Sequence, residues 1–280
     1  MSWFIIDNID EIDSPALVLY KERVKENIDR AVSMIKDVNL LRPHVKTNKI
    51  AEVCKMMTDA GITKFKCATI AEAEMLAGIN APDVLLAYQP VGPKAKRLLQ
   101  LIQKYPTTKF SCVTDNKESA NNLSAVFSSA GKTINVFIDL NIGMKRTGIL
   151  PAKAFDLFQH IHKLKGIEFV GLHGYDGHLN DKDINERKKN CDLSYSELPP
   201  LIVEIEKNIG RKLIIVAGGT PTFPIHLARH VECSPGTFVF WDYGYKNQLP
   251  DEPFEYAALV ITRIISITDA KTITTDLGYK

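Results

Sequence analysis

The chain has 280 residues, 45% of them hydrophobic and 24% charged, and its 35 basic and 33 acidic residues leave a net charge of +2. That balance excludes a dedicated nucleic-acid or membrane-surface binder, in which basic residues clearly outnumber acidic ones. No apolar run reaches the roughly 18 residues of a membrane helix, and no signal peptide is expected at the N-terminus. The five cysteines form no CxxC pair, so we expect reduced, buried thiols in a cytoplasmic protein.

The predicted elements alternate between strand and helix. Residues 3–20 are expected to be extended, and a first barrel strand is expected near residues 40–45. Helical patterns separate most of the later strands, and several of these patterns end at glycine. The strands are so apolar that they must be buried on both faces, which is typical of a parallel sheet. The later strands are predicted at residues 65–69, 83–88, 109–114, 134–140, 167–174, 212–219 and 237–243.

The spacing of these units favours one architecture. Eight strand–helix units between residues 18 and 243 use about 28 residues each, the size of a unit in a closed (β/α)8 barrel of the TIM type. A doubly wound open sheet is the alternative, because periodicity alone does not separate the two. After Tyr243 the pattern changes to strands without helices between them. We therefore predict an α/β barrel over 18–243 and a small, incomplete β-domain built from residues 1–17 and 244–280.

The segment LRPHVKTNKI, residues 41–50, carries the first candidate for chemistry. It places Lys46 at the carboxyl end of the first expected strand, where the active sites of barrels are assembled. Burial among the barrel walls lowers the pKa of a lysine, and Arg42 or Lys49 nearby would lower it further. This favours Lys46 as a Schiff-base nucleophile. An exposed, lysine-rich loop is the alternative interpretation.

The same segment carries a family resemblance. RPHVKTNK resembles the RPHxKTHK signature of the D-threonine aldolase and D-serine dehydratase family, which are fold-type III pyridoxal-phosphate enzymes with an alanine racemase-like N-terminal barrel. The resemblance implies pyridoxal 5'-phosphate as cofactor and Lys46 as the residue that binds it covalently, with Lys49 as the rival. Other segments are similar to that family in order and spacing, at residues 12–28, 67–80, 139–149, 171–178, 217–222 and 232–244.

A phosphate site is predicted after the seventh strand. Gly218 and Gly219 lack a Cβ, so backbone N–H groups can approach a dianion there, and Thr220 adds a hydroxyl. The segment SPGT is expected to lead into the eighth strand. Barrels commonly bind phosphate beside the loops after strands seven and eight. A tight turn is the alternative for the glycine pair alone.

Three further residues are assigned to the cofactor by resemblance. His44 lies within the lysine motif, Arg146 is implied as the partner of the phenolate oxygen, and Tyr175 is implied to lie near the pyridine ring. Arg146 could instead pair with Asp139. Tyr175 could instead donate a hydrogen bond to a loop carbonyl.

Two histidines are candidates for proton transfer. His173 and His178 follow or end the sixth predicted strand, and we take His178 as a catalytic candidate beside Lys46. Hydrogen bonding within the fold is the alternative for each. His226 and His230 are four residues apart, as in a metal pair, but no acidic base accompanies them as in HExxH.

The resemblance also implies a divalent metal (Mn, Mg or Zn), held in the family by a histidine and an aspartate or cysteine of the C-terminal β-domain. None of the seven histidines occupies that place, and the family pattern continues past TDLGYK, so we expect the metal ligands to be absent from this chain. The sequence is then either a shortened form or one that has lost half of the metal site. Asn48 replaces the second histidine of the signature, so acid–base chemistry is not expected there.

Three functions are therefore compared. The first is a lyase acting on small D-β-hydroxy-amino acids, with D-threonine aldolase-like cleavage ahead of D-serine dehydration or racemisation. The second is a non-catalytic protein that binds pyridoxal phosphate but lacks the metal site. The third is an unrelated barrel enzyme that uses AGGT to bind a phosphorylated metabolite. The resemblance further implies a homodimer.

Overall fold

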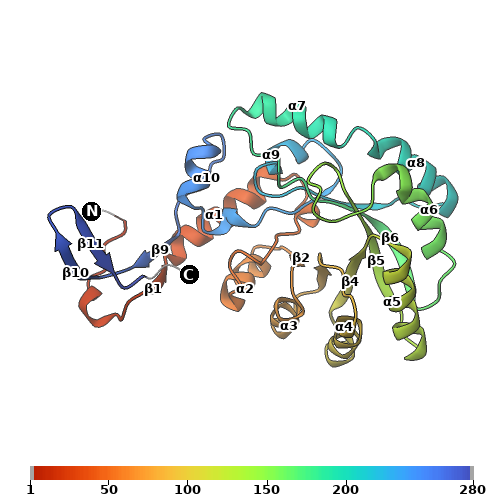
Figure 1. Ribbon diagram of the computed structural model, residues 1–280, viewed down its shortest axis with the longest axis horizontal. Coiled ribbons are helices and arrows are strands. Elements are labelled where there is room, and N and C mark those ends of the chain that lie inside the picture. Colours follow the sequence, from red (N-terminus) through yellow and green to blue (C-terminus); the bar gives the residue numbers. More distant parts are fainter. Residues whose placement is uncertain (1–2, 278–280) are drawn as a thin grey trace.

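The computed structural model describes residues 3–277 and has a parallel sheet at its centre (Figure 1). Seven strands follow one another around the sheet in chain order. Their apolar residues face helices on the outside and a second apolar cluster on the inside, as the parallel pattern predicts. The strands are β2 (Lys64–Cys67), β3 (Asp83–Leu86), β4 (Lys109–Thr114), β5 (Ile134–Leu140), β6 (Ile167–Gly174), β7 (Ile214–Ala217) and β8 (Glu232–Cys233).

Residues 41–45 close this sheet into a barrel. The Arg42 amide donates to the Cys233 carbonyl of β8 (2.8 Å), and the Val45 amide donates to the Lys66 carbonyl of β2 (2.9 Å). The segment thus lies between the two edge strands, parallel to both, in the place of a first strand. The predicted (β/α)8 barrel is confirmed, and the open sheet is excluded because neither edge is free.

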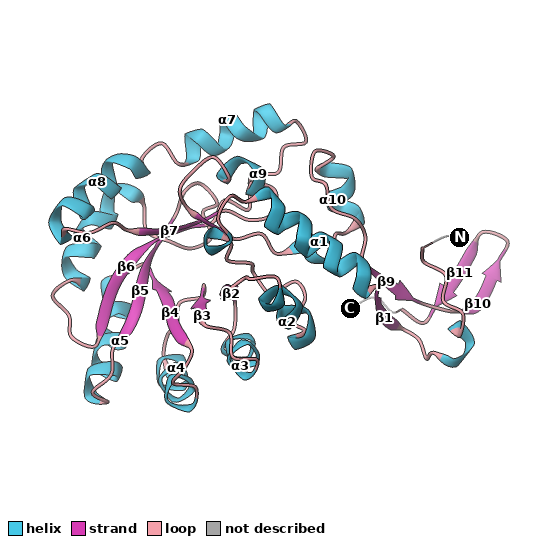
Figure 2. Ribbon diagram, turned by 180° about the vertical axis from the view of Figure 1, so that it is seen from behind, coloured by secondary structure: helices cyan, strands magenta, loops and turns pink. Residues whose placement is uncertain are grey.

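Helices cover the outside of the barrel (Figure 2). Local sequence explains where several of them begin: the Asn116 side chain accepts a hydrogen bond from the Ser119 amide, and proline occupies the first turn of α4 and of α6. No helix in residues 3–277 exceeds 14 residues, and none is suited to cross a membrane. The helices are α1 (Lys21–Met34), α2 (Ala51–Asp59), α3 (Ile70–Gly78), α4 (Pro93–Lys104), α5 (Lys117–Ser129), α6 (Pro151–Ile161), α7 (Ile184–Ser194), α8 (Leu198–Ile209), α9 (Phe223–His226) and α10 (Tyr243–Gln248).

The strand predicted at residues 237–243 is wrong. A 3-10 turn (Thr237–Val239) and the start of α10 occupy that segment, and the last barrel strand is β8. The apolar run is buried all the same: Phe238 and Trp241 pack against Phe254. The run therefore indicates burial and not a strand, an ambiguity that short apolar segments always carry. In consequence SPGT follows the last strand instead of leading into it.

The two chain ends meet in a β-region beside the barrel. β1 (Ala16–Leu19) pairs antiparallel with β9 (Ala258–Ile261), and β10 (Ile264–Asp269) forms a hairpin with β11 (Thr272–Thr275). Figure 1 shows this hairpin projecting away from the barrel. The predicted strands after Tyr243 are confirmed up to β11, and residues 278–280 of the last one lie outside the described residues.

Gly171 in β6 offers a test of this packing. A Cβ at Gly171 would overlap the Ile214 carbonyl oxygen of β7, which is backbone and cannot swing away. We expect Gly171→Ala to lower the free energy of unfolding by about 2 kcal/mol, because the two strands must separate. Gly78→Ala in α3 is the control: nothing lies within 4 Å of its Cβ, so alanine should raise that free energy by up to about 1 kcal/mol. Urea unfolding measures both, and similar values for the two variants would contradict the prediction.

Candidate active site

The predicted site residues gather at the carboxyl ends of the barrel strands. Lys46 follows the closing segment, Tyr175 follows β6, and Gly218 and Gly219 follow β7. Arg146 reaches the same end from the loop after β5. This is the end at which barrels assemble their active sites, because loops from many strands converge there.

Three cations surround the Tyr175 ring. Its centroid lies 5.3 Å from Lys46 Nζ, 5.6 Å from Lys66 Nζ and 5.0 Å from Arg146 Cζ. Within residues 3–277 none of the three makes an ion pair. Asp139 and Asp176, the two acids whose charges act on Lys66, are bonded to histidines. The space around the Tyr175 ring therefore has an excess of basic groups over acidic ones, which suits an anionic ligand.

The pKa of Lys46 is lowered from its ordinary value. Lys46 is exposed at the barrel mouth, but the surrounding walls enclose it in part. This partial burial is the main cause of the lowered pKa and the Arg146 charge the second, with Glu72 opposing them. The expectation that Arg42 or Lys49 supplies this charge is wrong. Arg42 instead bonds Glu232 (2.7 Å) at the other end of the barrel, and Lys49 is exposed.

His44 is buried next to Lys46. Its backbone bridges Lys66 of β2, and its Nδ1 accepts a hydrogen bond from the Lys46 amide (3.3 Å). Burial, then the charges of Lys66 and Lys46, hold the pKa of His44 well below its usual range. His44 is therefore a neutral imidazole at neutral pH.

His173 forms a buried pair with Asp139, their Nδ1 and Oδ1 atoms 2.7 Å apart. Burial lowers the pKa of His173, and the bond to Asp139 opposes that shift. Asp139 is thereby occupied, so the alternative pairing of Arg146 with it is not seen. His173 Nε2 is buried and has no hydrogen-bond partner among residues 3–277.

His178 lies apart from the other candidates. Its side chain is exposed in the loop after β6, and its Nε2 would be 2.7 Å from a Cβ at Gly143, in the loop that carries Arg146. It does not line the cavity that holds Lys46. Its catalytic role stays a prediction.

The loops after β7 and β8 present backbone donors side by side. The Gly236 and Thr237 amides both donate to Thr220 Oγ1 at 3.0 Å. A Cβ at Gly219 would lie 3.1 Å from the Tyr175 ring, and one at Gly218 would lie 2.6 Å from the His226 ring. The two glycines are thus needed for close packing. The Gly218 amide donates to the Gly174 carbonyl and the Gly219 amide to Thr222 Oγ1, so the phosphate site at these residues stays a prediction.

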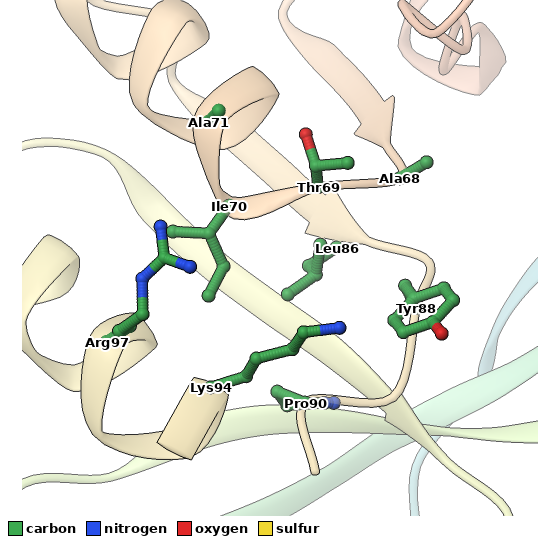
Figure 3. Close-up of a pocket in the computed structure, with 9 residues that line it drawn as sticks. All are labelled: Ala68, Thr69, Ile70, Ala71, Leu86, Tyr88, Pro90, Lys94 and Arg97. Carbon is green, nitrogen blue, oxygen red and sulfur yellow. The ribbon is translucent and has the colours of Figure 1, made fainter. Parts of the chain in front are cut away.

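A cavity of about 510 Å³ opens beside these groups and is lined by His44, Lys46, Asp139 and Arg146. A neighbouring groove of about 410 Å³ continues from it past Tyr88, where Lys94 extends from α4 with its Nζ 4.6 Å from the Tyr88 ring centroid (Figure 3). Both volumes lie in the range of small-molecule sites.

Asp176, Cys191 and His226 bring three potential metal ligands within 4.8 Å of one another. Arg229 donates to His226 Nδ1 (3.0 Å), so Nε2 carries the hydrogen and donates it to Asp176 Oδ2 (2.9 Å). Burial, then the Asp176 charge, raise the pKa of the Cys191 thiol to about 11, so it stays protonated. The three groups are close enough to hold one metal ion together, and as arranged they use their hydrogen-bonding capacity within the protein. His230 contributes no ligand to it.

Sequence reasoning missed Lys66. The signal was present: a single lysine stands between Phe65 and Cys67 in a strand expected to be buried on both faces. It also misses the Gly236 and Thr237 amides as the donors that hold Thr220, because the sequence predicts SPGT before the strand instead of after it.

Known proteins resemble the chain over most of its length. Residues 20–243 match the family "Alanine racemase, N-terminal domain". A D-threonine aldolase from Arthrobacter sp is 24% identical over 282 residues, covering 98% of this chain and 74% of the aldolase. A 3-hydroxy-D-aspartate aldolase from Paracoccus denitrificans (strain Pd 1222) is 23% identical over 283 residues, covering 96% and 73%. The crystal structure of D-threonine aldolase from Filomicrobium marinum superposes with a TM-score of 0.87 at 27% identity, covering 96% of this chain and 73% of that one. The chain therefore belongs to the alanine racemase N-terminal domain family.

Proposed function

We propose that this protein is a pyridoxal-phosphate-dependent lyase that cleaves the Cα–Cβ bond of D-β-hydroxy-amino acids to give glycine and an aldehyde. The observation that carries the proposal is Lys46, a lysine of lowered pKa at the mouth of the barrel beside Tyr175 and Arg146. The names of the two relatives, D-threonine aldolase and 3-hydroxy-D-aspartate aldolase, support the substrate class.

The residues present fit the cofactor. Lys46 is the amine that would bind its aldehyde. Thr220 Oγ1 accepts from the Gly236 and Thr237 amides, so its own hydroxyl hydrogen is the donor that would meet the phosphate. Gly219 lets the loop after β7 approach the Tyr175 ring, to which a Cβ would come within 3.1 Å. The excess of positive charge around the ring suits a multiply charged anion.

When bound, pyridoxal phosphate supplies an electron sink for the pair left on Cα when a bond there breaks. The Lys46 amine, neutral at a lower pH than an ordinary lysine, is the base that takes the proton of the substrate β-hydroxyl. Return of a proton to Cα gives glycine beside the released aldehyde. Arg146 donates hydrogen bonds to an anionic oxygen of the ligand and holds it in place. His44 stays uncharged and does not compete with Lys46 for the proton.

Several finer features belong to the same proposal. Residues 18–243 form the cofactor-binding domain, and residues 1–17 with 244–280 form a partial β-domain. The protein is cytoplasmic, and it is a homodimer. The exposed isoleucines of β10 and β11 support the homodimer, because they offer an apolar surface to a second copy. A divalent metal (Mn, Mg or Zn) is expected from the resemblance, but no step is assigned to it.

Product analysis tests the function. The cofactor-loaded protein is incubated with D-threonine, D-serine and D-alanine, with and without Mn²⁺ and after EDTA treatment. Aldehyde and glycine from D-threonine are the expected products. Pyruvate from D-serine would favour the dehydratase alternative, and conversion of D-alanine to L-alanine the racemase. Cofactor binding without any product would favour a non-catalytic binding protein.

A further inference from the structure

Lys66 points into the barrel. Its neighbours Phe65 and Cys67 pack in the outer core, and its register partner Leu85 lies in the separate apolar cluster formed by the inward faces of the strands. Adjacent residues of a strand face opposite sides, and register partners face the same side. The Lys66 side chain therefore lies inside the barrel, with its Nζ 5.6 Å from the centroid of the Tyr175 ring that Lys46 and Arg146 also approach.

The amine is buried without a counter-ion. Lys66 is 1% exposed, and within residues 3–277 its Nζ has neither an ion-pair nor a hydrogen-bond partner. Burying an ammonium group without a counter-ion costs several kcal/mol of folding free energy. The group is therefore neutral in the free protein, or it is charged only when an anion binds beside it. Burial, then the Lys46 charge, lower the pKa of Lys66 to about 7, which places its charge change near neutral pH.

The acids nearby do not supply that partner. Asp139 is bonded to His173, and both oxygens of Asp176 are used, one by Thr222 (2.8 Å) and one by His226 (2.9 Å). The groups that bear on the Lys66 charge from the surrounding elements are Arg42, His44, Lys46, Asp139, His173 and Asp176.

We propose that Lys66 is an oxyanion-binding residue of this site, whose amine takes up a proton and pairs with a phenolate or carboxylate oxygen of the ligand that lies against the Tyr175 ring. This oxyanion differs from a phosphate group, because the predicted phosphate site lies at the loops after β7 and β8 and Lys66 approaches from β2. The inference rests on the proposed function for the identity of the ligand, and it adds that this ligand presents an oxyanion to the Lys66 amine.

Proton uptake on binding is the direct consequence. At about pH 8 a free amine with a pKa of about 7 is mostly neutral, and an anion beside it raises the pKa, so binding takes up close to one proton. Below about pH 6 the amine is already protonated, and the uptake from Lys66 disappears.

The probe is pyridoxine 5'-phosphate, which lacks the aldehyde and cannot form a covalent adduct with Lys46. Calorimetric titration of the cofactor-free protein in Tris and in HEPES gives the protons taken up. We expect Lys66→Met to remove the uptake and weaken binding roughly tenfold or more. Lys66→Arg keeps the charge, so it should retain affinity without uptake. Lys153→Met, an exposed residue of α6, should match the unaltered protein.

Two further arms identify the oxyanion. Inorganic phosphate alone should bind with no uptake that depends on Lys66. If the uptake appears only when D-serine is added after pyridoxine phosphate, the oxyanion is the substrate carboxylate; if it appears with pyridoxine phosphate alone, it is the cofactor phenolate. Melting curves of each variant establish that it is folded, and Lys66→Gln replaces Lys66→Met if the latter is not.

Uptake that is the same in Lys66→Met as in the unaltered protein, at every ligand, overturns this inference. The proposed function fails by a different observation, namely absence of a borohydride-fixed adduct of pyridoxal phosphate on Lys46. An adduct on Lys46 together with uptake independent of Lys66 keeps the function and rejects the role of Lys66. Uptake that depends on Lys66, together with no adduct on Lys46, rejects the proposed function and keeps the oxyanion site.

Discussion

Replacing Lys46 with alanine is expected to abolish covalent binding of pyridoxal phosphate and to lower turnover by at least ~10³-fold, because the variant loses both the amine that binds the cofactor and the base. Lys46 is the lysine at the barrel mouth whose pKa is lowered by burial and by Arg146, and its Nζ lies beside Tyr175. Borohydride reduction followed by peptide mass spectrometry locates the adduct. Absorbance of the loaded protein gives an independent readout.

Lys49 provides the matched control, since it lies three residues away in the same motif. It is exposed and has a φ of 52°, so asparagine, which tolerates the left-handed region, is the suitable replacement. Lys49→Asn should keep the adduct and most of the activity. An adduct on Lys49, or one on Lys66 in the unaltered protein, would overturn the assignment of Lys46.

The architecture could be predicted from the sequence because it depends on repetition. Eight units of apolar strand and amphipathic helix leave few alternatives, and the strands at β4, β5 and β6 have the predicted bounds. The closing segment at residues 41–45 was placed correctly, although it joins its neighbours through isolated bridges. The last strand could not be predicted, because β8 has two residues, Glu232 and Cys233, and no apolar run.

The residues of the site could be predicted from the sequence only where they belong to a recognisable motif. Lys46, Arg146 and Tyr175 come together as expected, since each follows a strand and all strand ends meet on one side of the barrel. Lys66 lies within a strand, and its role depends on which face of that strand turns inward. That orientation is set by the register between β2 and β3, which local sequence does not specify.

Arg42→Met is expected to lower the free energy of unfolding by about 3 kcal/mol, because it breaks a buried ion-pair network and leaves charges without a partner. Arg42 is 1% exposed, and its guanidinium bonds Asp83 of β3 (2.6 Å) and Glu232 of β8 (2.7 Å). Nη1 also donates to the Phe65 carbonyl of β2 (3.3 Å). One side chain of the closing segment thus joins three strands, including both edges that the barrel must bring together. Urea unfolding followed by circular dichroism measures the loss.

The size of this effect depends on burial, and a surface pair shows the contrast. Lys25 and Asp29 form an i,i+4 pair in α1 with both side chains exposed, so Lys25→Met should change the free energy of unfolding by less than about 0.5 kcal/mol. Glu232 keeps a second cation in Lys64, which limits the loss in Arg42→Met. Asp83 keeps only the more distant Lys109 (4.0 Å), so adding Asp83→Asn to Arg42→Met removes the more isolated carboxylate and should recover part of the stability. A double variant less stable than the single one would show that Arg42 acts through packing and not through charge.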